Sequence, residues 1–81
     1  MRITVKFFAI LKDAASVSSL SIELPEGNTV WQAMEAVLLS EPRLRKFIPH
    51  CAFAVNRAYT SVETVLHDAD ELALIPPVSG G

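Results

Sequence analysis

The sequence predicts an α+β domain in which one main crossover helix packs on one face of a mixed sheet of about four to five strands. Three observations predict it: short stretches of alternating apolar and polar residues, one amphipathic helical stretch, and turn residues between them. Strands grouped around a single helix favour such a two-layer arrangement. With 81 residues the chain forms one domain, which buries only about 60–65% of its unfolded surface.

Two strands are expected near the amino terminus. Within residues 2–11, every second side chain is apolar and shares one face: Ile3, Val5, Phe7, Ala9 and Leu11. The other face begins polar and turns apolar at Phe8 and Ile10, so we expect the domain or a partner to cover these two side chains. Residues 12–18 are expected to form a loop, and residues 19–24 to form the second strand of a hairpin.

The main helix is expected to begin after Thr29. Thr29 and Gln32 have the spacing of a capping box, in which each side chain binds the other's backbone N–H. Four apolar residues then fall on one helical stripe: Val30, Met34, Val37 and Leu38. The helix should end before Pro42, because a residue that precedes proline avoids the helical conformation. Residues 44–48 are expected to form a short second helix or an irregular turn.

The remaining strands lie in the second half of the chain. Residues 51–56 are an apolar run and are expected to form a buried strand, followed by a turn at Asn56-Arg57. A short edge strand is expected at residues 59–61, a loop at 62–70, and the last strand at 72–75.

Two prolines mark the end of the predicted sheet. Pro76 and Pro77 cannot donate hydrogen bonds to a ladder, so the last strand must stop before them. The order of elements fits the β-grasp arrangement, in which the last strand lies parallel to the first. We therefore expect a β-grasp domain over residues 1–76 and a flexible Gly-Gly tail over residues 77–81.

Charge and composition exclude several functions. A net charge of −2 argues against nucleic acid as a partner, which would need a dense basic face. Arg43, Arg45 and Lys46 form the longest basic cluster; we expect a solvated surface there, or else a contact with an acidic partner. No stretch approaches the roughly 18–20 apolar residues of a membrane helix, and no signal peptide is evident, so a cytoplasmic chain without a membrane partner is expected. The apolar content of 51% indicates some exposed apolar surface for a partner.

Residues that commonly catalyse reactions form no recognisable motif. His50 and His67 have no acidic or cysteine partner at metal-binding spacing, so we expect no metal. Cys51 is the only cysteine and begins an apolar strand, which indicates a structural thiol. An acidic cluster before the last strand is expected to shape a turn: Asp68, Asp70 and Glu71. We expect no bound cofactor and no catalysis by the chain alone.

The Gly80-Gly81 ending is the remaining candidate for chemistry. Such a pair would occur at this position by chance on the order of 0.5% of the time. Glycine leaves its carboxylate unhindered, and Pro76-Pro77 favours an extended segment that would project the tail into a partner. We expect the Gly81 carboxylate to react after activation by ATP. The alternative is an ordinary terminus of small residues.

The ending Ile75-Pro76-Pro77-Val78-Ser79-Gly80-Gly81 resembles the small subunit of molybdopterin synthase, a ubiquitin-like sulfur carrier. Phe7-Phe8-Ala9, Val55-Asn56 and Asp70-Glu71 resemble the same family, and the likeness covers the whole chain. The resemblance implies a ubiquitin-like β-grasp fold. It also implies that an adenylating enzyme activates Gly81 with ATP and that a persulfide protein supplies sulfur for a thiocarboxylate. The large synthase subunit would then accept the tail, and the sulfur would build the dithiolene of molybdopterin from cyclic pyranopterin monophosphate.

The resemblance also implies which residues bind partners. Phe8, Tyr59 and Ile75 would form an apolar sheet face, although the family more often has an aliphatic residue at position 59 and an aromatic one at 75. The tail would enter the partner through four further residues: Pro76, Pro77, Val78 and Ser79. Packing within the domain is the alternative for Phe8 and Ile75. Three other functions stay open: a protein modifier joined to lysines through Gly81, a sulfur carrier for another pathway such as thiamine, and an interaction domain with an incidental tail.

Overall fold

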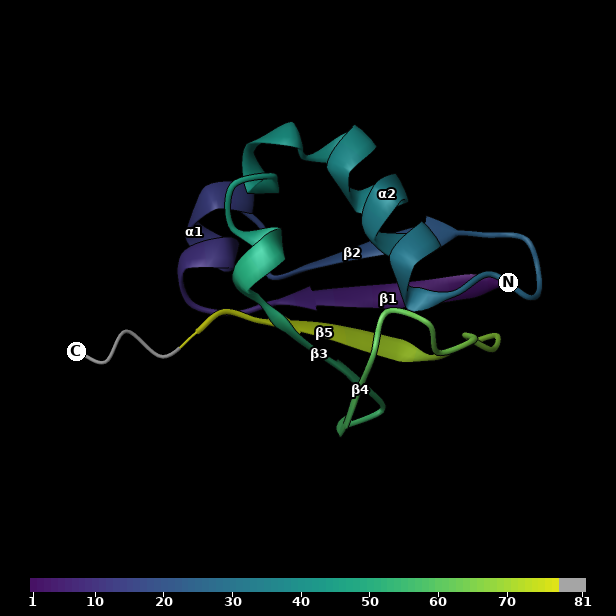
Figure 1. Ribbon diagram of the computed structural model, residues 1–81. Coiled ribbons are helices and arrows are strands. Elements are labelled where there is room, and N and C mark those ends of the chain that lie inside the picture. Colours follow the sequence, from purple (N-terminus) through teal and green to yellow (C-terminus); the bar gives the residue numbers. More distant parts are fainter. Residues whose placement is uncertain (78–81) are drawn as a thin grey trace.

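The computed structural model describes residues 1–77 and shows a five-stranded mixed sheet with helices on one face (Figure 1). The strands are β1 (Arg2–Phe7), β2 (Ser19–Glu23), β3 (Ala52–Val55), β4 (Ala58–Thr60) and β5 (Glu71–Ile75). Their order across the sheet is β2-β1-β5-β3-β4. β1 pairs antiparallel with β2 and parallel with β5, so the last strand lies beside the first, as predicted. The α+β class and the β-grasp order are confirmed.

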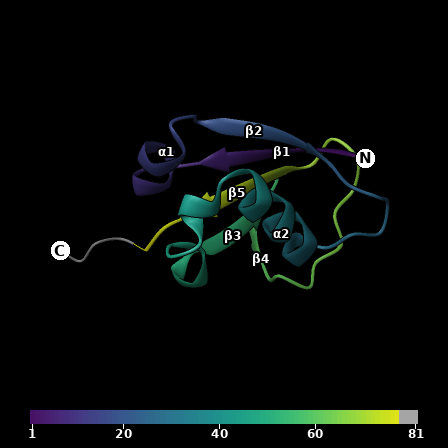
Figure 2. The ribbon, with the colours of Figure 1, turned by 90° about the horizontal axis from the view of Figure 1, so that it is seen from above.

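The helical layer is formed by four segments: α1 (Ile10–Ala15), α2 (Val30–Ser40), and the 3₁₀ turns η1 (Pro42–Leu44) and η2 (Ile48–His50). Seen from above, α2 lies over the β5–β3 side of the sheet, and α1 lies at the carboxyl end of β1 (Figure 2). The predicted start of α2 is confirmed: Thr29 is its N-cap, and the Gln32 side-chain oxygen accepts the Thr29 N–H at 2.7 Å. No helix in residues 1–77 is long and apolar enough to span a bilayer.

The core lies between the sheet and the helices. Large apolar side chains of the central strands point into it: Ile3, Val5, Phe7, Leu72 and Leu74. The buried stripe of α2 meets them with Val30, Met34 and Val37, whereas Leu38 is only partly buried. Each fully buried aliphatic or aromatic side chain contributes about 1.5–3 kcal/mol. The alternations read from the sequence therefore identify the strands and the helix that build the core.

The predicted strand over residues 2–11 is wrong in its second half. β1 ends at Phe7, and a helix replaces part of the expected loop. The change from strand to helix occurs at Ala9, whose φ of 51° turns the chain sharply between β1 and α1. Leu11 and Ala15 are then buried on the same side of α1, four residues apart. The apolar run before Lys12 is compatible with both the strand and the helix period, so its pattern could not distinguish them.

Other expected elements differ in smaller ways. β1 and β2 are antiparallel neighbours, as expected, but α1 interrupts their connection, so they form no tight hairpin. β3 is less buried than predicted, because only Ala54 of its four residues is fully covered. β4 begins one residue earlier than predicted. The turn at Asn56-Arg57 is confirmed, and both residues have positive φ, as in a type I′ hairpin turn.

The carboxyl end of β5 determines where the rest of the chain leaves the domain. β5 runs parallel to β1 and ends at Ile75, on the side of the molecule where α1 lies (Figure 1). Val78, Ser79, Gly80 and Gly81 lie outside the described residues. The predicted boundary between a domain over 1–76 and a flexible tail over 77–81 therefore stays a prediction.

Candidate docking site

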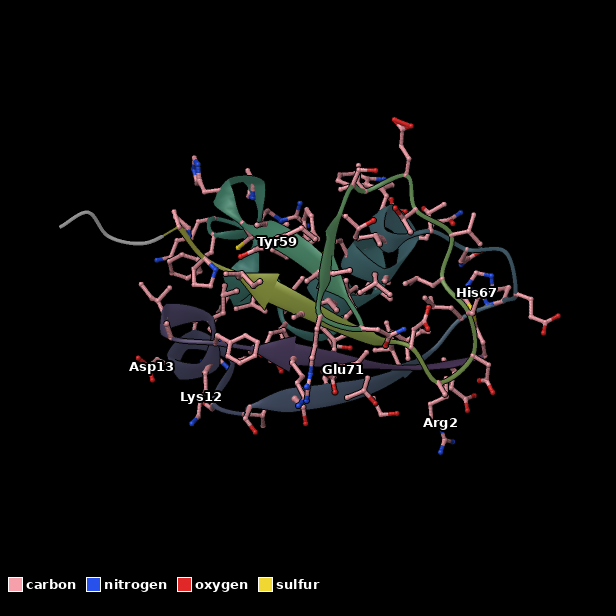
Figure 3. The ribbon with its side chains drawn as sticks, turned by 90° about the horizontal axis from the view of Figure 1, so that it is seen from below. Arg2, Lys12, Asp13, Tyr59, His67 and Glu71 are labelled. Atoms are coloured by element: carbon pink, nitrogen blue, oxygen red, sulfur yellow. The ribbon has the colours of Figure 1, made fainter. Side chains whose placement is uncertain are left out.

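In residues 1–77, no helix covers the sheet face opposite α1 and α2, although Ala54 on this face is buried (Figures 1 and 3). The strand register places four side chains in one row across this face: Lys6, Ala73, Ala54 and Tyr59. Two alanines in the middle of the row keep its floor low. Tyr59 stands at the β4 end of the row with 76% of its surface exposed. A low floor with a tall aromatic rim is suited to receiving apolar groups from another protein.

A shallow hollow of about 340 Å³ lies on this open face. Its lining consists of Lys6, Phe8, Ala54, Arg57, Tyr59, Glu71, Ala73 and Ile75. The three predicted docking residues Phe8, Tyr59 and Ile75 thus surround one surface feature. Phe8 is 46% exposed, and Ile75 is half-buried. Packing within the domain therefore leaves much of Phe8 available, and the docking role of all three residues stays a prediction.

A second hollow, of about 600 Å³, lies where β5 ends. Its lining consists of Phe8, Ala9, Ile10, Phe47, His50, Ile75, Pro76 and Pro77. Phe8 and Ile75 line both hollows, so a continuous apolar surface runs from the open face around the end of the sheet. Pro76 and Pro77 belong to this surface, and their predicted role in binding a partner stays a prediction.

Sequence reasoning missed part of the second hollow. Phe47 lies in the connection between η1 and η2, and His50 is the last residue of η2. No periodic pattern places this segment beside the end of β5. The sequence places Ile10 on the otherwise polar face of a strand, to be covered by the domain or a partner. It is 48% exposed, and it belongs to α1 and not to a strand. The apolar character of Ile10, close to Phe8 in the sequence, is the one sequence signal that points to this hollow.

Polar contacts hold the β3–β4 turn against the start of β5. The Asn56 side-chain amide donates to Asp70 Oδ1 at 2.9 Å, and its oxygen accepts the Glu71 N–H at 3.0 Å. Asp70 also accepts the His67 N–H at 2.8 Å, so the acidic cluster shapes turns, as predicted. This bracing fixes the turn from which β4 presents Tyr59. The exposed ion pair between Lys6 and Glu71, at 3.3 Å, adds little stability.

The described residues contain no catalytic grouping on this surface. Cys51 is half-buried, its Sγ donates to the Phe47 carbonyl at 3.3 Å, and burial raises the pKa of its thiol. A thiol with a raised pKa is a weak nucleophile near neutral pH. Within residues 1–77 no three His, Cys, Asp or Glu side chains are placed to hold a metal ion. The predicted reactive residues, Gly80 and Gly81, lie outside the described part.

Comparison with known proteins agrees with the resemblance. The ThiS family matches residues 5–81. The molybdopterin synthase sulfur carrier subunit of Chlamydomonas reinhardtii is 34% identical over 83 residues, which cover the whole of both chains.

Solved structures show the same fold. SAMP1 from Haloferax volcanii has a TM-score of 0.91 and 29% identity, with both chains fully covered, which confirms the ubiquitin-like β-grasp fold. A chain in the complex of subunits 1 and 2 of molybdopterin-converting factor from Helicobacter pylori has a TM-score of 0.73 and 29% identity, again over both full chains. The chain therefore belongs to the ThiS family and groups with its molybdopterin synthase sulfur carrier subunits.

Proposed function

We propose that the chain is the sulfur-carrier subunit of a molybdopterin synthase and that its Gly81 carboxylate carries the sulfur. The observation that carries this function is the likeness to sulfur carrier subunits over the whole chain. The fold supports it, because the apolar surface around Phe8 and Ile75 surrounds the point where the chain continues toward Gly81.

The first proposed step is activation of the carboxylate. A carboxylate is a poor acyl donor because its leaving group would be oxide. In a partner adenylating enzyme, the Gly81 carboxylate attacks the α-phosphate of ATP, which releases pyrophosphate and forms an acyl adenylate. ATP is bound by that enzyme, and the carrier itself binds no cofactor. Because the reaction needs ATP, we also propose the cytoplasm as its location.

The second proposed step puts sulfur on Gly81. The terminal sulfur of a persulfide on a donor protein attacks the adenylate and displaces AMP, which gives an acyl disulfide. A thiol then cleaves the S–S bond, forms a new disulfide and leaves a thiocarboxylate on the carrier. Glycine suits both steps because it has no side chain to obstruct a narrow active site.

The last proposed step delivers the sulfur. Phe8, Tyr59 and Ile75 dock on the large synthase subunit, and the segment from Pro76 to Ser79 leads Gly80 and Gly81 into its active site. Sulfur passes to cyclic pyranopterin monophosphate, and two such transfers build the dithiolene. The Helicobacter pylori relative, solved in a complex of subunits 1 and 2 of molybdopterin-converting factor, supports this partner.

A second candidate function is protein modification. A structure of small archaeal modifier protein 1 from Haloferax volcanii has a TM-score of 0.88 and 25% identity to this chain. A modifier would pass the activated Gly81 acyl group to lysine side chains of target proteins and form isopeptide bonds. Both functions use the same adenylate, and they differ in the nucleophile that attacks it.

The intact mass of the chain tests the sulfur-carrier function. After incubation with the adenylating enzyme, ATP and a persulfide donor, we expect a mass gain of about 16 Da, the difference between one sulfur and one oxygen atom. The Gly81 deletion is the control: it should gain no mass and should unfold at the same denaturant concentration as the full chain. A chain that forms isopeptide adducts and no thiocarboxylate would favour the modifier function. A chain that is adenylated but never gains sulfur would contradict the carrier function.

A further inference from the structure

Cations predominate at one end of the domain and carboxylates at the other. Figure 3 places Lys12 and Asp13 at the end where β5 stops, and Arg2 and His67 at the other end. The end with Lys12 also carries three cations from the segment around η1: Arg43, Arg45 and Lys46. Acidic residues gather at the end with Arg2 and His67, namely Glu23, Asp68 and Asp70. A chain with a net charge of −2 thus has a basic end from which the tail leaves.

The three clustered cations line a third hollow, of about 550 Å³, which we call the basic hollow. Its lining consists of Asp13, Ala14, Pro42, Arg43, Arg45, Lys46 and Phe47. Arg43 lies 3.7 Å from the Glu41 carboxylate. Within residues 1–77, no carboxylate lies within ion-pair distance of Arg45 or Lys46, and the Lys46 ammonium lies 5.2 Å from the Phe47 ring centre. The hollow therefore presents more positive charge than its own carboxylates balance.

The basic hollow adjoins the hollow that contains Pro76 and Pro77, the last residues that the structure describes. Phe47 lines both this hollow and the apolar one that contains Pro76 and Pro77. Residues 78–81 span at most about 14 Å when fully extended. A protein that holds Gly81 in its active site must therefore lie against this end of the domain.

We infer that the basic hollow binds an acidic surface of the adenylating enzyme beside the opening that admits the tail. The inference rests on the proposed function. Arg43, Arg45 and Lys46 face carboxylates of the enzyme, and Phe47 with Ile10 supplies the apolar part of the contact. The acidic far end of the carrier is repelled by the same surface, so the charge division orients the carrier with its tail toward the enzyme.

The chemistry of the two proposed tail-binding proteins favours the adenylating enzyme as the occupant. That enzyme handles ATP with Mg²⁺, an ion that proteins hold with carboxylates. The large synthase subunit instead has to hold an anionic pterin phosphate, for which cationic side chains are suited. The ATP phosphates also call for cationic side chains, but the carboxylates that hold Mg²⁺ offset them. A basic carrier surface beside the tail therefore meets less repulsion at the first active site than at the second.

Charge reversal tests the inference. Arg45→Glu and Lys46→Glu are compared with Arg2→Glu, which changes the net charge equally at the opposite end. The measurement is kcat/KM for the carrier in ATP-dependent pyrophosphate release by the adenylating enzyme. In about 50 mM salt we expect each basic-hollow variant to lose about tenfold in kcat/KM, with kcat unchanged and less than about twofold loss in 500 mM salt. Arg2→Glu should change kcat/KM by less than about twofold at either salt concentration.

Four outcomes would overturn the inference. In the first, the wild-type chain is activated normally, and kcat/KM falls no more in Arg45→Glu and Lys46→Glu than in Arg2→Glu. This result would overturn the inference and leave the proposed function standing. A wild-type chain that is never activated would overturn both. Weakened binding of Arg45→Glu to the large subunit, with unchanged activation, would make that subunit the occupant. The wild-type carrier could also associate with itself in sedimentation, in a salt-sensitive way. If Arg45→Glu loses this association and keeps normal activation, a second copy of the chain is the occupant.

Discussion

The two faces of the sheet are built from the same strands but differ in side-chain size and cover. Along β5, Leu72 and Leu74 are fully buried beneath the helices, whereas Ala73 and Ile75 on the other face remain partly exposed. In residues 1–77, the helical layer covers one face of the sheet, as the small size of the domain leads one to expect. The other face can therefore keep apolar surface that contributes little to folding and remains available to a partner.

The largest expected effect separates the two faces within one strand. Leu74→Ala should lower the free energy of unfolding by about 2–5 kcal/mol, because it removes a fully buried side chain and leaves a cavity. Ile75→Ala should cost only about 1 kcal/mol, because the wild-type side chain already meets water. Urea unfolding of both variants measures the difference. Equal losses would show that Ile75 belongs to the core and would break the comparison.

The next effect concerns docking on the open face. Tyr59→Ala should weaken binding to the large synthase subunit about 10- to 100-fold, because an exposed aromatic side chain beside the apolar residues of a hollow has the character of a binding hot spot. Its free energy of unfolding should change by less than about 0.5 kcal/mol.

Tyr59→Phe keeps the ring and serves as the matched control in calorimetric titration. If Tyr59→Phe keeps the wild-type affinity and Tyr59→Ala loses it, the apolar area of the ring, and not the hydroxyl group, accounts for the binding contribution of Tyr59. If Tyr59→Ala binds as tightly as the wild type, the open face is not the docking surface for that subunit.

A smaller effect is expected from the floor of the same hollow. Ala73→Leu fills space between Lys6 and Ala54 and should weaken docking about tenfold, while Ala73→Ser, which stays small, should bind nearly as well as the wild type. Unfolding measurements should show less than about 1 kcal/mol change for either variant, because residue 73 faces the hollow and not the core. Tighter binding by Ala73→Leu would show that apolar area matters more than the shape of the floor.

Much of the covered face could be predicted from the sequence. The alternation of Ile3, Val5 and Phe7 identified β1, and the spacing of Thr29 and Gln32 identified the start of α2. Such patterns are local and periodic, and burial against one layer is what produces them.

The end of the sheet could not be predicted in the same way. The positive φ of Ala9 leaves no mark in the sequence, since glycine is the residue that usually signals it, so α1 was missed. Phe47 reaches the root of the tail through tertiary packing of an irregular connection, so neither the second hollow nor the basic hollow follows from spacing. The docking roles of Phe8 and Tyr59 came from the family resemblance, and the structure adds that both side chains line one hollow.

The smallest expected effect tests whether the covered side of the domain is purely structural. Burial raises the pKa of the Cys51 thiol above its ordinary value of 9.0, so the native chain holds less thiolate at pH 8 than the unfolded chain. Alkylation by iodoacetamide at pH 8, followed by intact mass, should therefore be slower in the folded chain than in urea. The difference should shrink as the pH rises past the raised pKa, where the folded chain also forms thiolate.

The matching variant, Cys51→Ala, should still gain sulfur on Gly81 at the wild-type rate. Its unfolding free energy should fall by no more than about 1 kcal/mol, because the thiol is half-buried and makes one weak hydrogen bond to a carbonyl. If Cys51→Ala folds normally but forms no thiocarboxylate, the covered side takes part in the sulfur chemistry. The covered face would then have a chemical role as well as a structural one, and the contrast with the docking face would not hold at Cys51.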